Sequence, residues 1–112
     1  MTRYGLLIDY EFCSGCHSCE VSCKMERGLP VGEWGIKLAQ IGPWQVGDTE
    51  KWQYDFIPVP TVQCNLCAER TEIGKLPLCV HNCQSACMQY GPVEELAAYM
   101  SGKEKTVLFA PL

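Results

Sequence analysis

The chain lacks any long apolar run. Its longest aliphatic stretch is Leu6-Leu7-Ile8, far shorter than the roughly 20 residues that cross a bilayer. The N-terminus also lacks the pattern of a secretory leader and a twin-arginine pair. We therefore expect no direct insertion into a membrane and a cytoplasmic location, although a protein exported together with a partner needs no signal of its own.

An excess of positive charge is missing as well. Nine Lys and Arg residues against 13 Asp and Glu residues give a formal net charge of −4, whereas sequence-independent binding of nucleic acid needs a basic face. Nucleic acid is therefore not an expected partner. Phosphate-binding loops, dinucleotide-binding loops and Ser/His/Asp constellations are absent too, so the sequence predicts no substrate site and no catalytic residue.

Large aliphatic and aromatic residues are scarce, because Leu, Ile, Val and Phe together number only 26 of the 112 residues. A chain of this length has room for a single domain, 1–112, and so small an apolar core usually needs cross-links or metal. Cysteine is abundant instead. The nine cysteines are Cys13, Cys16, Cys19, Cys23, Cys64, Cys67, Cys79, Cys83 and Cys87, in two groups separated by a gap of 40 residues.

Three interpretations of the cysteines compete. Disulfides are disfavoured because the number is odd and no secretory signal is present. Zinc would suit the C-x₂-C and C-x₃-C pairs of the second group taken alone. The first group does not suit zinc, because C-x₂-C-x₂-C-x₃-C packs four thiolates into residues 13–23. That spacing is the cysteine run of bacterial ferredoxins and predicts two [4Fe–4S] clusters.

In such a run the first three cysteines bind one cluster and the fourth binds the other. The predicted ligands are Cys13, Cys16, Cys19 and Cys83 for cluster 1, and Cys23, Cys64, Cys67 and Cys79 for cluster 2. Cys87 is left over. Packing as a small buried apolar residue is favoured for it, with the roles of alternative ligand or redox thiol left open. Because eight cysteines fill two cubanes, His17 and His81 are not expected to bind iron.

Apolar patterning and breaker residues predict an α+β fold. Strands are expected over residues 3–9, 88–90 and 106–109, helices over 17–27 and 92–100, and a short helical stretch over 68–74. Strand, cluster loop and helix thus occur twice. We therefore expect a ferredoxin-like two-cluster core with pseudo-two-fold symmetry, formed by residues 1–27 and 61–112.

Residues 28–60 form an expected insertion that holds all three tryptophans, five glycines and four prolines. Strands over 34–41 and 52–62 make it a β-hairpin, with turn signals at Gly42-Pro43 and Gly47-Asp48. The favoured role of the tryptophans is to shield the clusters from water, and docking to a partner is the alternative. In the second cysteine group, Arg70 is expected either beside a cluster sulfur or in solvent.

Three stretches resemble the iron–sulfur electron-transfer subunits of molybdenum or tungsten pterin oxidoreductases of the dimethyl sulfoxide reductase type. They are residues 13–24, the C-x₂-C-x₂-R…G-x₂-P-x-C-x₃-C pattern over 64–83, and residues 88–91 with the helix and strand that follow. The sequence departs from the family in having two cluster motifs instead of the usual four. Gln84 also stands where the family usually has proline, and Cys87 where it often has alanine.

The resemblance implies a non-catalytic subunit that carries two [4Fe–4S] clusters and exchanges electrons with a large catalytic partner in anaerobic metabolism. A molybdenum or tungsten pterin enzyme is the expected partner, with a flavin enzyme as the alternative. Two other functions remain open, a free-standing ferredoxin and a structural zinc-binding interaction module. The tryptophan-rich insertion exceeds what a minimal carrier needs, which favours a permanent subunit.

Overall fold

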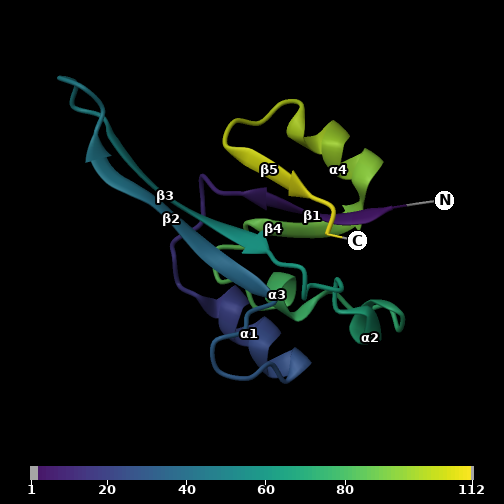
Figure 1. The fold of residues 1–112 in the computed structure, drawn as a ribbon. Coiled ribbons are helices and arrows are strands. Elements are labelled where there is room, and N and C mark those ends of the chain that lie inside the picture. Colours follow the sequence, from purple (N-terminus) through teal and green to yellow (C-terminus); the bar gives the residue numbers. More distant parts are fainter. Residues whose placement is uncertain (1–2, 112) are drawn as a thin grey trace.

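The computed structural model describes residues 3–111, so the outermost residues of the predicted domain 1–112 lie outside the described part (Figure 1). Three strands form an antiparallel sheet, in which β1 (Tyr4–Asp9) lies between β4 (Met88–Pro92) and β5 (Thr106–Phe109). Helices and strands are both present, as expected for an α+β fold. The N-terminal strand is therefore held between two strands from the C-terminal part of the sequence.

The two faces of β1 serve different layers, because successive side chains of a strand point to opposite faces. Leu6 and Ile8 are at most 1% exposed and pack with Met88 and five of the cysteines in one core. The other face is covered by α4 (Val93–Met100), whose Leu96 is buried (Figure 1). The sheet thus separates one helix from a layer that contains the cysteines.

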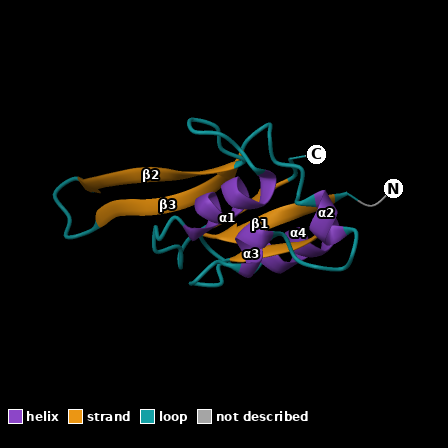
Figure 2. Cartoon of the chain, turned by 90° about the horizontal axis from the view of Figure 1, so that it is seen from below, coloured by secondary structure: helices purple, strands orange, loops and turns teal. Residues whose placement is uncertain are grey.

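Three helices form the cysteine layer: α1 (Ser18–Arg27), α2 (Ala68–Thr71) and α3 (Leu78–His81). Helices α1 and α3 lie side by side below the sheet (Figures 1 and 2). The side chain of Asn82, at the end of α3, donates a hydrogen bond of 2.9 Å to Ser22 Oγ on α1. No helix within residues 3–111 has the length and apolar character needed to cross a membrane.

Helix α1 ends as predicted at Gly28, which adopts φ of 63°. Its N–H bonds to Met25 O at 3.4 Å, and the N–H of Leu29 bonds to Lys24 O at 3.0 Å. Glycine accepts this left-handed conformation without a steric penalty and commonly ends helices. The end of the helix directs the chain toward the insertion.

The insertion is a two-stranded antiparallel hairpin, β2 (Ile36–Gln45) and β3 (Trp52–Pro60), which projects from the rest of the molecule (Figures 1 and 2). We call residues 36–60 the arm. Trp44 and Trp52 lie near its tip and are 53% and 64% exposed. The prediction that the tryptophans shield the cysteines is therefore wrong for these two, because their place on the arm leaves them in solvent.

Trp34 lies before the arm, between two ammonium groups. Lys24 Nζ and Lys37 Nζ are 4.2 and 4.4 Å from its ring centre. A cation over the face of an indole is attracted by the ring quadrupole. Trp34 thereby ties α1 to the base of β2.

The turn predicted at Gly42-Pro43 is wrong, because β2 continues through this dipeptide with a bulge between Ile41 and Trp44. Gly42 has φ of 99°, and a Cβ there would lie 1.9 Å from Gln53 O on the facing strand. The glycine is needed for this close approach within a bulged strand. The turn lies instead at the predicted second site, where Val46 N donates to Lys51 O at 2.9 Å.

Two further differences concern short segments. Helix α3 was not expected, since four residues are too few to show a helical apolar pattern. Pro92, predicted as the first residue of a helix, ends β4 and caps α4 with an extended backbone, φ −61° and ψ 137°. Proline suits both places because its fixed φ fits extended and helical chains alike.

Candidate metal centre

Of the first three predicted ligands, Cys13 and Cys16 lie on the loop between β1 and α1, and Cys19 lies in the first turn of α1. Gly15 and His17 have φ of 75° and 64°, and these left-handed residues bend the loop sharply. The backbone N–H of Gly15 donates to the Cys13 sulfur. The loop therefore turns backbone dipoles toward its own cysteines.

The same local contact recurs in the other cysteine loops. A backbone N–H two residues further along the sequence reaches the sulfur in four cases: Gly15 to Cys13, Ser18 to Cys16, Leu66 to Cys64 and Ser85 to Cys83. N–H groups aimed at sulfur stabilise thiolate charge, and they are one of the means by which proteins set the potential of iron–sulfur clusters. These N–H groups therefore oppose the rise in thiol pKa that burial causes.

Cys13, Cys16, Cys19 and Cys83 form one group of neighbouring thiols. The pKa of Cys19 is raised to about 12, mainly by burial and in smaller part by the Cys13 thiol, the Glu20 carboxylate and the Cys83 thiol. Burial and then the charge of Cys83 raise the pKa of Cys13. The N–H of Gln84 reaches the Cys16 sulfur. Residues about 70 positions apart in the sequence thus meet in one place.

Cys23, Cys64, Cys67 and Cys79 form a second group. The pKa of Cys23 is raised to about 11, mainly by burial and in smaller part by the Cys67 and Cys64 thiols. The pKa of Cys79 is raised by burial and by the other three thiols, and to a smaller extent by Cys19 of the first group. These are the sets that spacing assigned to the two clusters, while their binding of iron stays a prediction.

No group of three or more His, Cys, Asp or Glu side chains within residues 3–111 is arranged so that it could hold a metal ion. The cysteines are therefore two neighbourhoods of thiols and not closed sites. Their chemistry fits two cubanes, because a [4Fe–4S] cluster takes four thiolates. The second neighbourhood has four thiols, and the first has its four predicted ligands together with Cys87. Most of these thiols are buried, and backbone N–H groups point at them.

Cys16 is the exposed member of the first group. The hydroxyl and N–H of Ser18 lower the pKa of its thiol. It opens onto a hollow of about 570 Å³ between α1 and α3, whose rim includes the exposed side chains of Val21 and Met25. The first thiol group therefore comes nearest to solvent at Cys16.

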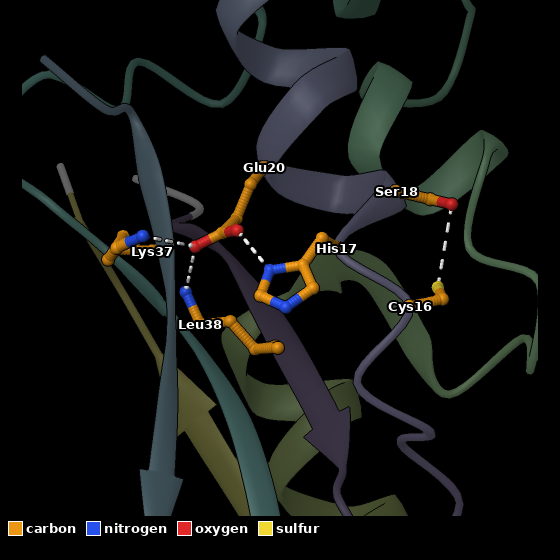
Figure 3. Close-up of polar contacts among 6 residues, drawn as sticks. All are labelled: Cys16, His17, Ser18, Glu20, Lys37 and Leu38. Atoms are coloured by element: carbon orange, nitrogen blue, oxygen red, sulfur yellow. Dashed lines mark hydrogen bonds and ion pairs between the residues drawn. The ribbon is translucent and has the colours of Figure 1, made fainter. Parts of the chain in front are cut away.

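Glu20 joins this loop to the base of the arm (Figure 3). Its carboxylate is 3% exposed, accepts the Leu38 N–H at 2.6 Å and lies 2.5 Å from His17 Nδ1 and 3.2 Å from Lys37 Nζ. Burial disfavours the charged carboxylate, but these three partners outweigh burial and hold its pKa below the usual value. A single side chain thus links α1 with β2, next to Cys19.

Replacing Glu20 with alanine should loosen the arm where it joins α1. The loss leaves the part-buried Leu38 N–H without its acceptor, which costs about 1–3 kcal/mol. Amide hydrogen exchange in residues 36–41 should accelerate by about tenfold or more. Lys37→Ala is the comparison variant, because it leaves the Leu38 acceptor in place and removes a half-exposed ion pair and a cation–π contact with Trp34, each worth about 1 kcal/mol or less. Equal exchange in both variants would show that Glu20 does not anchor the arm.

Gly35 was not predicted as a site residue, and it lies directly against Cys23. Its backbone N–H donates to the Cys23 sulfur, and a Cβ at this position would stand 2.4 Å from that sulfur. No other residue type fits without displacing the thiol. The contact joins residues 12 positions apart, so neither motif spacing nor local turn chemistry indicates it.

Gly35→Ala should therefore displace the Cys23 sulfur and cost the protein the iron bound with it. The expected result is loss of cluster 2, measured as a fall in iron per chain while the signal of cluster 1 persists. Gly102→Ala is the control, since a Cβ there meets nothing within 4 Å. Full iron loading of the Gly35 variant would contradict the proposed place of Cys23 in the site.

Arg70 was expected either beside a cluster sulfur or in solvent, and the arginine that acts on the thiols is Arg27. Arg27 donates to Gln63 O at 2.7 Å, and its charge acts to lower the pKa of both Cys23 and Cys64. Arg70 instead donates to Leu76 O at 2.9 Å and holds its own loop. Helical spacing could have indicated the place of Arg27, because this residue follows Cys23 by four positions and so lies on the same face of α1.

The protein is similar in sequence to subunits of known oxidoreductases, although no family model matches it. It is 51% identical over 43 residues to a proposed iron–sulfur subunit of the dimethyl sulfoxide reductase of Halobacterium salinarum, covering 38% of this chain and 16% of that protein. It is 30% identical over 91 residues to one chain of the anaerobic dimethyl sulfoxide reductase of Haemophilus influenzae, covering 79% of this chain and 41% of that one.

A third relative has a different substrate in its name. It is a subunit of the tetrathionate reductase of Salmonella typhimurium, 40% identical over 48 residues, covering 43% of this chain and 19% of the relative. The protein thus spans less than half the length of these relatives. The resemblance drawn from the cysteine motifs, to iron–sulfur subunits of this class of oxidoreductases, is confirmed.

Proposed function

We propose that this protein carries two [4Fe–4S] clusters and relays single electrons to or from a larger redox subunit. The observation that carries the proposal is the gathering of eight cysteines from two distant segments into two groups of four, with backbone N–H groups on their sulfurs. The clusters supply the one-electron chemistry, over a range of roughly −700 to +450 mV. The protein binds them, orients them and limits their contact with water.

The arrangement of the protein suits a relay. The charge of Cys19 raises the pKa of Cys79, as do the three thiols of its own group. The two proposed clusters would therefore be neighbours across the α1–α3 contact. Arg27 and the N–H of Gly35 both act on the side of cluster 2, where positive charge favours the reduced, more negative state. We propose a ferredoxin-like core of residues 1–27 and 61–112, with pseudo-two-fold symmetry.

The proposed partner is a catalytic subunit with a molybdenum or tungsten pterin. The relatives are named as subunits of dimethyl sulfoxide and tetrathionate reductases, and the cysteine motifs resemble those of iron–sulfur subunits of pterin enzymes. A flavin enzyme is the second choice. The arm, with Trp44 and Trp52 exposed, offers apolar surface for a permanent contact, and Cys16 offers the shortest way from cluster 1 to the surface. An anaerobic setting and the cytoplasmic location expected from the sequence belong to the same proposal.

Purification without oxygen under native conditions tests this function. The protein should elute in a one-to-one complex with a large redox subunit, and reduction should produce paramagnetic resonance signals of two interacting [4Fe–4S] clusters. Electrons from a low-potential donor should then reach the partner's cofactor only when the clusters are present. A stable monomer with both clusters at physiological concentration would point to a free-standing ferredoxin instead.

A further inference from the structure

The ninth cysteine, which the two-cluster scheme leaves unused, is not remote from the ligands. Cys87 Sγ lies 3.6 Å from Cys83 Sγ. Its thiol also forms a hydrogen bond with Cys13. The spare sulfur therefore touches two of the four thiols assigned to cluster 1.

Cys87 is also well fixed in the fold. It is 3% exposed and belongs to the core that includes Leu6, Ile8 and Met88. Its carbonyl accepts the Asp9 N–H at 2.8 Å, which attaches it to the end of β1. Because Cys87 is fixed beside Cys83, only a small displacement of its sulfur would bring it to an iron atom bound by Cys83.

Cys83 remains the better ligand of the two. Its sulfur receives the backbone N–H groups of Ser85 and Cys87, the first of which is the contact seen at Cys13, Cys16 and Cys64. It also sits on a partly exposed turn, with Ala86 at φ of 52° between the two cysteines. The Cys83 thiol is thus positioned to bind iron, and the Cys87 thiol is fixed next to it.

We propose that Cys87 is a reserve ligand of cluster 1, placed to bind the iron atom that Cys83 otherwise holds; this inference rests on the proposed function. In the exchange, the bond between Cys83 sulfur and iron breaks and a bond between Cys87 sulfur and the same iron forms. The Cys87 thiol gives up its proton, and the released Cys83 thiolate takes one up. No electron is gained or lost.

Substitution of Cys83 tests the inference, with iron and sulfide content and the resonance spectrum of the reduced protein as readouts. Cys83→Ala should retain about eight iron atoms per chain, with an altered signal for cluster 1. The double variant Cys83→Ala/Cys87→Ala should lose iron from cluster 1, whereas Cys87→Ala alone should keep both clusters unchanged. Cys79→Ala is the matched control, since all its neighbouring thiols are already assigned as ligands, and it should lose iron from cluster 2.

The outcomes separate the two claims. If Cys83→Ala loses as much iron as the double variant, Cys87 only packs, and the inference is wrong while the proposed function stands. If the unaltered protein takes up no iron after anaerobic reconstitution, the proposed function is wrong and the reserve ligand is wrong with it. Cys83→Val, which keeps an apolar side chain without a metal-binding atom, checks that any loss comes from the missing ligand and not from a collapsed turn.

Discussion

Stripping iron from the loaded protein should unfold most of the cysteine layer and weaken the sheet above it. Five cysteines belong to the main core, together with Leu6, Ile8, Ile36, Leu66 and Met88. Helices α2 and α3 have four residues each, far fewer than the roughly 12–15 that an isolated helix needs. Without metal, the sulfur–iron bonds that would hold eight thiols close together are absent.

Circular dichroism and limited proteolysis measure this effect. Chelation under reducing conditions should remove most of the helical signal and open residues 61–87 to cleavage, while readdition of iron and sulfide should restore both. The same incubation without chelator is the control. Unchanged spectra and an unchanged protease pattern after complete loss of iron would mean that the apolar residues alone hold the fold, and that the clusters are not structural.

Single ligand substitutions should divide the cysteines into two sets, each of which combines cysteines from both segments of the sequence. Cys13→Ser should damage cluster 1 and leave cluster 2 intact, whereas Cys23→Ser should damage cluster 2 and leave cluster 1 intact. The reason is that Cys23 lies with Cys64, Cys67 and Cys79 although it follows Cys19 by only four residues. Each substitution should cost about half of the bound iron, or a single iron where a three-iron cluster survives.

Resonance spectra of the reduced variants distinguish the crossed scheme from a local one. Cys64→Ser removes another proposed ligand of cluster 2 and should give the spectrum of Cys23→Ser. The Cys83/Cys87 double variant should match Cys13→Ser. If Cys13→Ser and Cys23→Ser abolish the same signal while Cys64→Ser abolishes the other, each cluster is held by one local run, and the two groups of neighbouring thiols do not reflect iron binding.

Much of the candidate site could be predicted because its chemistry depends on short-range spacing. A C-x₂-C loop with an N–H two residues beyond its first cysteine is a local structure, so residues 13–19 and 64–67 indicate it without further information. The end of α1 at Gly28 and the strands β1 and β5 follow from equally local signals, namely a glycine cap and short apolar runs. Local patterns suffice where the structure itself is local.

The features that escaped prediction depend on contacts between distant residues. The Gly42-Pro43 dipeptide suits a turn as well as a bulge, and the close approach of Gln53 decides between them. Gly35 matters only because Cys23 packs against it, and Glu20 only because β2 presents the Leu38 N–H to it. The sequence favoured packing for Cys87, which its burial supports, and left the role of alternative ligand open; its distance to Cys83 depends on the path of the chain through Ala86.

The metal content of anaerobically purified protein tests the central claim most directly. Iron, acid-labile sulfide and zinc should be measured on the same sample, against protein concentration from amino-acid analysis. Two [4Fe–4S] clusters require about eight iron and about eight sulfide per chain, with negligible zinc. About two zinc ions per chain, with no iron, no sulfide and no brown colour, would contradict the account and identify a structural zinc module.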